Sequence, residues 1–274
     1  MCQGKLYLCP TPIGNLEDIT LRTLRILREV DIVAAEDTRR SLTLLNHFEI
    51  KKPMISYFEH NKRQRGEEII KMLKDGKNVA LVTDAGTPAI SDPGEMLVCQ
   101  CIEENIDVVP LPGACAVITA LTVSGKPTGR FSFQGFLTVN KTARKEHLLS
   151  VRNYTDTLIF YEAPHKLLST LKDMLAILGD REISLCRELT KTHEETVRLT
   201  ISQAIEKYEE TPPKGEFVLV IKGADEPVAE VSDEPLEEIY KKYLDAGMSD
   251  KDALKAAAKD KGISKRDAYA QLKV

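Results

Sequence analysis

Acidic side chains follow four apolar runs that have the composition of β-strands. They are Glu36 with Asp37, Glu59 with His60, Asp84, and Glu162. In open α/β sheets ligands bind at the carboxyl ends of the strands, so residues at these ends are expected to share one cleft. A carboxylate or a neutral imidazole placed there can accept a proton during a reaction. A single acid at a helix start is often only a cap, but the convergence of several predicts an active cleft.

The most informative of these strand ends is the run from residue 79 to residue 94. An apolar strand, Val79 to Val82, leads into the sequence T-D-A-G-T-P-A-I-S-D-P-G, which contains two prolines, two glycines and two aspartates. This concentration of turn residues favours a ligand-binding turn over an ordinary loop. A helix is predicted to start at its end, with Asp92 as the N-cap and Pro93 in the first helical position.

The elements that position these residues alternate between strand and helix in the first half of the chain. Strands are predicted at 5–9, 31–35, 54–57, 78–83 and 107–111, each followed by a segment with helical periodicity. Such alternation predicts a mainly parallel sheet with helices on both faces. A helix rich in small residues is expected to follow residues 111–113 and to end near Ser124.

The second half of the chain is also predicted to be α/β, with more antiparallel pairing. Its strands are expected at 131–137, 157–161, 182–188, 196–200 and 216–221. The fold class is therefore α/β, with two α/β domains and a small-molecule site in the cleft between them. The predicted domains are 1–113 and 114–224, followed by an acidic, proline-containing linker at 225–234 and a helical tail at 235–274.

The tail is predicted to form three short helices at 235–245, 249–261 and 264–272. Ser249 and Ser264 each precede an aspartate by three residues, which is typical of a helix N-cap. Residues 250–274 contain seven lysines and arginines against four aspartates. The pattern resembles a helix-turn-helix unit that contacts nucleic acid, and a packing or dimer-supporting tail is the alternative.

Composition narrows the class of protein. The 274 residues are 42% hydrophobic and 29% charged, as in globular proteins with a sizeable core. No apolar run approaches the length of a membrane span, which predicts a protein without a membrane association. The six cysteines form no C-x-x-C pair, so reduced core residues of a cytoplasmic protein are expected. No cluster of histidines and cysteines has metal-ligand spacing, and no metal is predicted.

The net charge of −4 is unevenly distributed. Residues 206–238 contain eleven acidic residues against three lysines, so the rest of the chain is net positive. Basic clusters occur at 39–40, 62–65, 141–145 and in the tail. Each cluster is compatible with a solvated helix face, and together they permit an RNA partner.

Six ordered motifs carry a family resemblance. They are C-P-T-P-I-G-N-L-E-D-I-T, A-A-E-D-T-R, Y-F-E-H-N, V-T-D-A-G-T-P-A-I-S-D-P-G, L-P-G-A-C-A and F-Y-E-A-P-H-K. This set resembles the tetrapyrrole methylase superfamily over about residues 4–223, and within it the ribosomal RNA small subunit methyltransferase I group. Residues 10–15, P-T-P-I-G-N, replace the glycine-rich first loop general to the superfamily, which favours the ribosomal RNA group.

The resemblance implies S-adenosylmethionine as cofactor, bound between two α/β domains. It also implies 2′-O-methylation of a cytidine in the decoding region of small-subunit rRNA, and a homodimer. Small residues would allow the cofactor to approach the backbone closely, and apolar ones would contact its adenine. By matching position, the cofactor-binding residues would be Pro10, Asp84, Ala85, Gly86, Ile90, Cys115, Ala116, Glu162 and Leu189.

Transfer of a methyl group to a ribose hydroxyl requires that the hydroxyl proton leave, so a general base would help. Asp37 is the first candidate for this base and His60 the second, with Glu36 and Glu59 as rivals. Arg39, Arg40 and Arg63 are predicted to contact phosphates, because the forked guanidinium suits them.

The sequence is also compatible with two alternative functions. One is a methyltransferase of the same fold that acts on a precorrin-type tetrapyrrole. The other is an rRNA-binding assembly factor without catalysis, which would not need to keep the small residues of the D-A-G-T-P turn. For the leading function, the substrate is either free rRNA or the assembled 30S particle.

Overall fold

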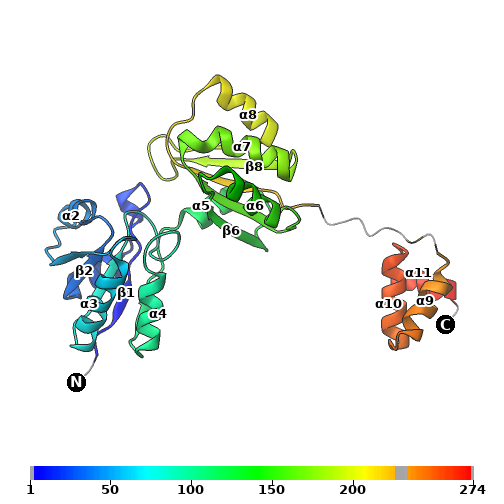
Figure 1. Cartoon of the computed structure of the whole chain (residues 1–274), viewed down its shortest axis with the longest axis horizontal. Coiled ribbons are helices and arrows are strands. Elements are labelled where there is room, and N and C mark those ends of the chain that lie inside the picture. The colour runs from blue at the N-terminus through cyan, green and yellow to red at the C-terminus, as the bar shows by residue number, and fades with distance from the viewer. Residues whose placement is uncertain (1–2, 226–231, 233, 273–274) are drawn as a thin grey trace. The chain divides into compact units, whose positions relative to one another are not determined.

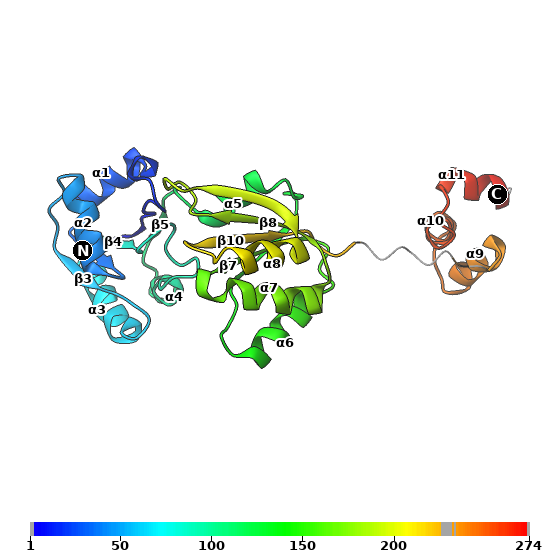
Figure 2. The ribbon, with the colours of Figure 1, turned by 90° about the horizontal axis from the view of Figure 1, so that it is seen from above.

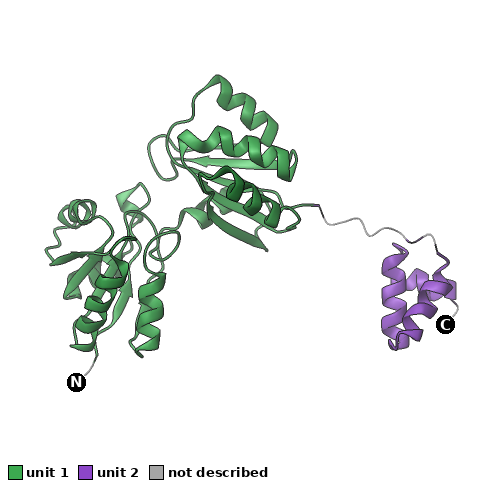
Figure 3. Cartoon of the chain, viewed as in Figure 1, with its two compact units in different colours: residues 1–224 green, residues 225–274 purple. Residues whose placement is uncertain are grey.

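The computed structural model describes residues 3–225, 232 and 234–272. It divides into two compact units, Met1–Ala224 and Asp225–Val274, which are coloured separately in Figure 3. Most of the expected linker, at 226–231 and 233, lies outside the described residues. Each unit is described by itself.

The first half of the larger unit is a five-stranded parallel sheet. Its strands are β1 (Leu6–Leu8), β2 (Ile32–Ala35), β3 (Met54–Ser56), β4 (Val79–Val82) and β5 (Val108–Pro110), in the order β3-β2-β4-β1-β5. Every pairing is parallel, as the alternating sequence predicted. The 3-10 helix η1 (Leu16–Asp18) and the helices α1 (Leu21–Glu29), α2 (Thr38–His47), α3 (Lys62–Lys74) and α4 (Glu95–Glu103) connect the strands.

Helices cover both faces of this sheet (Figure 1). Strand residues alternate between two cores: Val79 and Leu81 pack with α3 and α4, whereas Ala80 and Val82 pack with α1 and α2. In register, Leu8 and Leu81 are partners, and so are Ala35 and Val82. The loops after β1, β2 and β4 therefore leave the sheet at the same edge.

The second half is a mixed sheet. Its strands are β6 (Phe131–Phe136), β7 (Thr157–Glu162), β8 (Glu182–Arg187), β9 (Glu195–Thr200) and β10 (Phe217–Ile221), in the order β6-β7-β10-β8-β9. Only β6 and β7 pair in parallel among the pairings described; the other three are antiparallel, as expected. Helix α5 (Ala116–Ser124) packs on one face, and α6 (Lys141–Val151), α7 (Pro164–Leu178) and α8 (Ile201–Glu210) pack on the other (Figure 2).

The smaller unit contains α9 (Leu236–Asp245), α10 (Asp250–Asp260) and α11 (Lys265–Leu272) around a small core of leucine, isoleucine and alanine. The expected serine caps are present: Ser249 accepts a hydrogen bond from the backbone of Asp252 at 3.3 Å, and Ser264 from that of Asp267 at 3.1 Å. None of the described helices is both long and apolar enough to cross a membrane.

Two local predictions were wrong. Helix α4 begins at Glu95 with Gly94 as its N-cap, so Asp92 does not cap it. Gly94 has φ +151° and lies against Leu81, where an added Cβ would come within 3.1 Å of the Leu81 Cδ2 atom. The φ of Gly94 is not helical, so the helix begins two residues later than predicted. Cys99 is exposed rather than in the core, whereas Cys9 and Cys186 are buried.

A buried ion pair joins α6 to α7 in the second half. Arg144 and Asp173 are separated by 2.6 Å and their side chains are only 10% and 12% exposed. We expect Asp173→Ala to lower the free energy of unfolding by about 3–5 kcal/mol, because it leaves a buried guanidinium without its partner. The neighbouring exposed pair Lys172–Glu209 provides the control, since Lys172→Ala should cost less than about 1 kcal/mol. Denaturant unfolding followed by circular dichroism measures both; equal losses would contradict the prediction.

Candidate functional site

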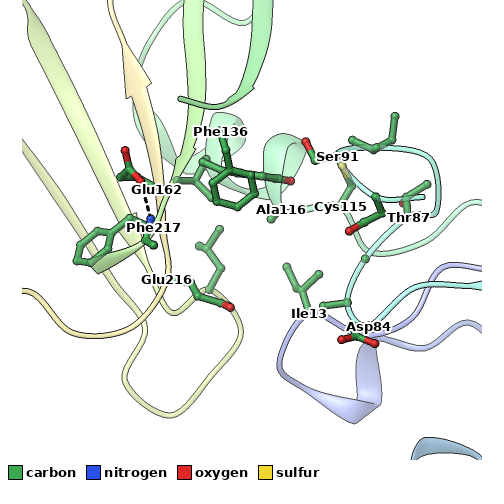
Figure 4. Close-up of a pocket in the computed structure, with 18 of the residues that line it drawn as sticks. Ile13, Asp84, Thr87, Ser91, Cys115, Ala116, Phe136, Glu162, Glu216 and Phe217 are labelled. Carbon is green, nitrogen blue, oxygen red and sulfur yellow. Dashed lines mark hydrogen bonds between the residues drawn. The ribbon is translucent and has the colours of Figure 1, made fainter. Parts of the chain in front are cut away.

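A cavity of about 370 Å³ lies between the loops of the parallel sheet and the strand ends of the mixed sheet. We call it the donor cavity. Figure 4 shows side chains from both halves of the larger unit around it, including Asp84 and Thr87 from the turn after β4, and Glu162 and Phe217 from β7 and β10. Its volume lies within the range of about 300–1,000 Å³ that is usual for small-molecule sites.

Eight of the nine residues predicted to bind the cofactor line this cavity. They are Asp84, Ala85, Gly86, Ile90, Cys115, Ala116, Glu162 and Leu189. Their assignment to the cofactor stays a prediction, but the structure brings them together from four separate segments of the chain.

Pro10, the ninth predicted residue, is not among the lining residues. It is buried, and it packs closely against Gly113, where an added Cβ would lie 2.5 Å from the Pro10 Cβ. Its neighbour Thr11 exchanges two backbone hydrogen bonds with Gly86, of 2.9 and 3.0 Å. Pro10 therefore acts on the cavity through the position of the first loop, residues 10–15, rather than by lining it.

The turn after β4, residues 83–94, depends on unusual backbone conformations. Gly86 has φ +88°, and the non-glycine residues Ala89 and Ser91 have φ values of +68° and +64°. Left-handed conformations are costly for residues with a side chain, so this strain marks a turn held by its surroundings. Thr87 contributes to this restraint by donating a hydrogen bond to the carbonyl of Ala114 at 2.9 Å.

Three carboxylates line one side of the donor cavity: Glu36, Asp84 and Asp92. The hydroxyl of Thr83 donates a hydrogen bond to Glu36 at 2.8 Å. Asp84 accepts one from the backbone of Asp37 at 3.1 Å and pairs with the Arg40 guanidinium at 3.0 Å. Burial and the negative charge of Glu36 raise the pKa of Asp84. One arginine thus faces three acids, which leaves this wall negative.

Asp92 is the most perturbed acid of this wall. Burial, followed by the negative charge of Glu36, raises the pKa of Asp92 to about 7; a hydrogen bond with Thr83 opposes the change and Asp84 adds to it. An acid with this pKa is partly ionised at neutral pH, which suits a group that must accept a proton. The perturbed pKa of Asp92 could not be anticipated from the sequence, because an aspartate before a proline has the pattern of a helix cap.

Asp37, the first candidate for the general base, lies in a different environment. It caps α2 by accepting the Arg39 backbone N–H at 2.9 Å, and it pairs with the Arg39 guanidinium at 2.8 Å. The side-chain and backbone hydrogen bonds from Arg39 lower the pKa of Asp37 to about 2. It does not line the donor cavity. Such a carboxylate is ionised but only weakly basic.

Two further candidates for the general base, His60 and Glu59, also lie outside the donor cavity. His60 is exposed and makes an edge contact with Phe58, with the ring centroids 6.2 Å apart. It does not line the donor cavity, and neither does Glu59.

The arginines that were predicted to contact phosphates are exposed. Arg39 and Arg63 are exposed on α2 and α3, as a phosphate contact requires. Arg40 is exposed too, yet it also lines the cavity beside Asp84.

The opposite wall is mainly apolar but also carries Glu162, Glu188, Glu216 and Lys191. The apolar residues there that were not anticipated from the sequence are Ile13, Phe136, Tyr161, Cys186, Phe217 and Val218. The side chain of Glu162 is buried there. Its carboxylate accepts hydrogen bonds from the Thr170 hydroxyl at 2.6 Å and from the backbone N–H of Ala163 at 2.9 Å. Ile13 could have been inferred from its place in the first loop. The strand residues carried no signal, because buried strands have the same composition whether or not they face a ligand.

Comparison with known proteins assigns the family. The sequence-family model for tetrapyrrole (corrin/porphyrin) methylases matches residues 5–205 of this chain. A protein named ribosomal RNA small subunit methyltransferase I from Halalkalibacterium halodurans is 50% identical to this chain, over 97% of this chain and 94% of that protein. A protein of the same name from Bacillus subtilis is 47% identical, over 97% of this chain and 93% of that protein. The chain belongs to the tetrapyrrole methylase family, in its ribosomal RNA small subunit methyltransferase I group.

Solved structures share the fold of the larger unit at low identity. Diphthine synthase has a TM-score of 0.62 at 14% identity, covering 80% of this chain and 90% of that one. The uroporphyrin-III C-methyl transferase from Thermus thermophilus, solved with S-adenyl homocysteine, has a TM-score of 0.56 at 18% identity, covering 79% and 97%. The two α/β sheets and their arrangement are therefore those of tetrapyrrole methylases.

The cofactor of this methyltransferase group is S-adenosylmethionine, and the donor cavity has the chemistry to hold it. Ile13 and Leu189, in the apolar wall, would contact the adenine. Ala116 is the first residue of α5, whose N-terminal N–H groups would suit the carboxylate. The carboxylates of Glu36 and Asp84 would suit the positive charge of the cofactor. When bound, this cofactor supplies an electrophilic methyl group.

Gly86 provides a test of the cofactor assignment. We expect Gly86→Val to reduce affinity for S-adenosylmethionine at least about tenfold, because a β-branched residue does not tolerate φ +88° and the turn must move. Isothermal titration calorimetry measures the affinity. Gly179→Val is the matched control, since Gly179 has φ +83°, does not line the cavity and has no atom within 4 Å of an added Cβ. An equal loss of affinity in both variants would reject the assignment.

Proposed function

We propose that this chain transfers a methyl group from S-adenosylmethionine to the ribose 2′-hydroxyl of a cytidine in the decoding region of small-subunit rRNA, cytidine 1402 in standard rRNA numbering. The observation that supports it is the near full-length similarity to methyltransferases named for small-subunit rRNA. The donor cavity supplies the chemistry, with a small-residue turn on one side and an acidic wall beside it.

The reaction is an in-line displacement. The 2′-oxygen forms a bond to the methyl carbon as the carbon–sulfur bond breaks, and the sulfur keeps that electron pair. The hydroxyl proton passes to a carboxylate of the protein. Alignment of the two reactants supplies much of the rate enhancement, since a well-oriented encounter can be worth about 7–11 kcal/mol.

We propose Asp92 as the proton acceptor. It lines the donor cavity with Glu36 and Asp84, whereas Asp37 and His60 do not line it. Asp37, held by Arg39, is better suited to fixing the start of α2 and the position of its arginines. The catalytic roles of Asp37 and His60 stay predictions, and the variants below test that of Asp37.

The RNA would approach the side of the parallel sheet where α2 and α3 present their arginines. Arg39, Arg40 and Arg63 are exposed there and can bind phosphates. Free rRNA and the 30S particle are both candidate substrates, and the protein would meet either in the cytoplasm. The helical unit at 235–274 would add further contacts to the RNA.

A homodimer is also part of the proposal. β6 is an edge strand of the mixed sheet, and the aromatic residue Phe131 at its start is 40% exposed. Val139, just beyond the strand, is 71% exposed. An edge strand with exposed apolar side chains is a natural surface for self-association.

The alternatives are separated by the acceptor that receives the methyl group. Incubation with labelled S-adenosylmethionine should label 30S subunits or free small-subunit rRNA at a cytidine ribose, and should leave porphyrin precursors unlabelled. Label on the precursors would identify a tetrapyrrole methyltransferase. Binding of rRNA without any label would identify an assembly factor.

The proton acceptor is tested by the pH dependence of the methylation rate. A base works in its ionised form, so the single-turnover rate of the wild type should rise as pH increases through about 7 and level off above. Asp92→Asn should lower the rate by about 10²–10⁴-fold and remove this rise, with affinity for S-adenosylmethionine within a few-fold of wild type.

Asp37→Ala discriminates between the two candidates. If Asp37 is the base, this variant loses turnover while it keeps cofactor binding, and Asp92→Asn retains the rate and its pH profile. If Asp92 is the base, Asp37→Ala keeps the rise near pH 7, because the pKa of Asp37 lies far below it.

A further inference from the structure

A second cavity, of about 270 Å³, lies beside the donor cavity. It is built from the first loop, η1, α2 and the end of β4, all in the parallel-sheet half of the larger unit. Its lining residues combine apolar groups, hydroxyls and two side chains that can carry positive charge: Thr11, Pro12, Gly14, Leu16, Arg40, Ser41, Thr43, Leu44, His47, Thr83 and Asp84.

The two cavities share a wall. Arg40 and Asp84 line both of them, and their ion pair of 3.0 Å spans that wall. Thr11 fixes the wall from the side of the first loop, because its hydroxyl donates to the carbonyl of Thr83 at 3.1 Å. A molecule in the second cavity therefore lies next to the acidic wall of the donor cavity.

One stripe of α2 faces this second cavity. Arg40, Thr43, Leu44 and His47 are spaced three, four and seven residues apart, which places them on one side of a helix. Leu42 and Asn46, on the same helix, do not line the cavity. The sequence around this stripe therefore provides both lining positions and matched positions outside the cavity.

The lining suits a nucleoside with an attached phosphate. Pro12, Leu16 and Leu44 offer apolar surfaces for a flat base, and Leu16 is 40% exposed at present. Ser41 and Thr43 offer hydroxyls that can donate to or accept from a base edge.

We propose that this second cavity is the acceptor pocket, which holds the target cytidine after it leaves the RNA stack and places its ribose at the wall shared with the donor cavity. This inference rests on the proposed function and assigns the substrate subsite. Enzymes that act on a stacked base gain access by extruding the nucleotide into such a pocket. The same extrusion here would carry the attached ribose to the shared wall. Arg40 then has two roles: it holds Asp84 in place, and it lies where a phosphate of the extruded nucleotide would pass.

The proposal is tested by placing a large side chain in the acceptor pocket at Thr43, an exposed lining residue. We expect Thr43→Trp in the full chain to lower the single-turnover rate of rRNA methylation by about 10²-fold, because a displaced ribose cannot align with the methyl group. Affinity for S-adenosylmethionine, measured by calorimetry, should stay within twofold, since Thr43 does not line the donor cavity. Leu42→Trp is the control, and it should keep both the rate and the affinity.

A titration with cytidine 5′-monophosphate gives an independent readout. In the full chain with methyl-labelled leucines, the nucleotide should shift the signals of Leu16 and Leu44, and Thr43→Trp should abolish these shifts while Leu42→Trp retains them. Absence of any shift in the wild type up to millimolar nucleotide would overturn the proposal. So would shifts caused by a porphyrin precursor instead of the nucleotide.

The outcomes separate this inference from the proposed function. If the wild type methylates rRNA and Thr43→Trp does so at the same rate, the acceptor pocket is wrong and the function stands. If the wild type methylates no RNA, the function fails, and the nucleotide titration decides the pocket by itself. Loss of cofactor affinity in Thr43→Trp with an intact thermal transition would also overturn the proposal, because it would place Thr43 in the donor site.

Discussion

The site depends on one backbone contact, the pair of hydrogen bonds between Thr11 and Gly86. It ties the first loop to the turn after β4, two segments about 75 residues apart in the chain. Gly86 can make this contact because its φ of +88° turns both of its polar backbone groups toward the first loop. Thr11 uses its side chain as well, on the carbonyl of Thr83. Without this junction neither the donor cavity nor the second cavity would have its common wall.

The electrostatics of that wall follow from its position. Three acids, Glu36, Asp84 and Asp92, lie at the ends of parallel strands and in the following turn, where burial removes water from them. Their mutual repulsion is partly offset by Arg40. In the proposed reaction, a negative, poorly hydrated wall would favour a cationic methyl donor over its neutral product, and it would take up the proton that the reaction releases. The same arrangement would then serve binding and chemistry.

The strands of this fold could be predicted well from the sequence, because apolar β-branched runs bounded by turn residues carry a strong local signal. All ten observed strands fall at the predicted positions, and the parallel and mixed characters of the two sheets were also anticipated. The cavity residues that belong to the six sequence motifs could also be identified from the sequence. Phe136 and Val218 could not, since they reach the cavity only through the packing of β6 and β10. Pro10 shows the opposite case: its motif is distinctive, yet its side chain packs on Gly113.

Two aspartates show most clearly where local sequence stops being informative. Asp37 and Asp92 each stand just before a predicted helix, and each therefore had the pattern of an N-cap. Asp37 is one: hydrogen bonds from Arg39 bring its pKa to about 2. Asp92 is not, because its helix starts later, at Glu95, and its carboxyl lies among other acids with a pKa of about 7. The pKa of Asp37 is lowered by hydrogen bonds from Arg39, two residues along the chain, whereas the pKa of Asp92 is raised by burial and by the charge of Glu36, which is distant in sequence. Basicity at this site is therefore a property of the tertiary structure, and it distinguishes an acid that can receive a proton from one that holds a helix in place.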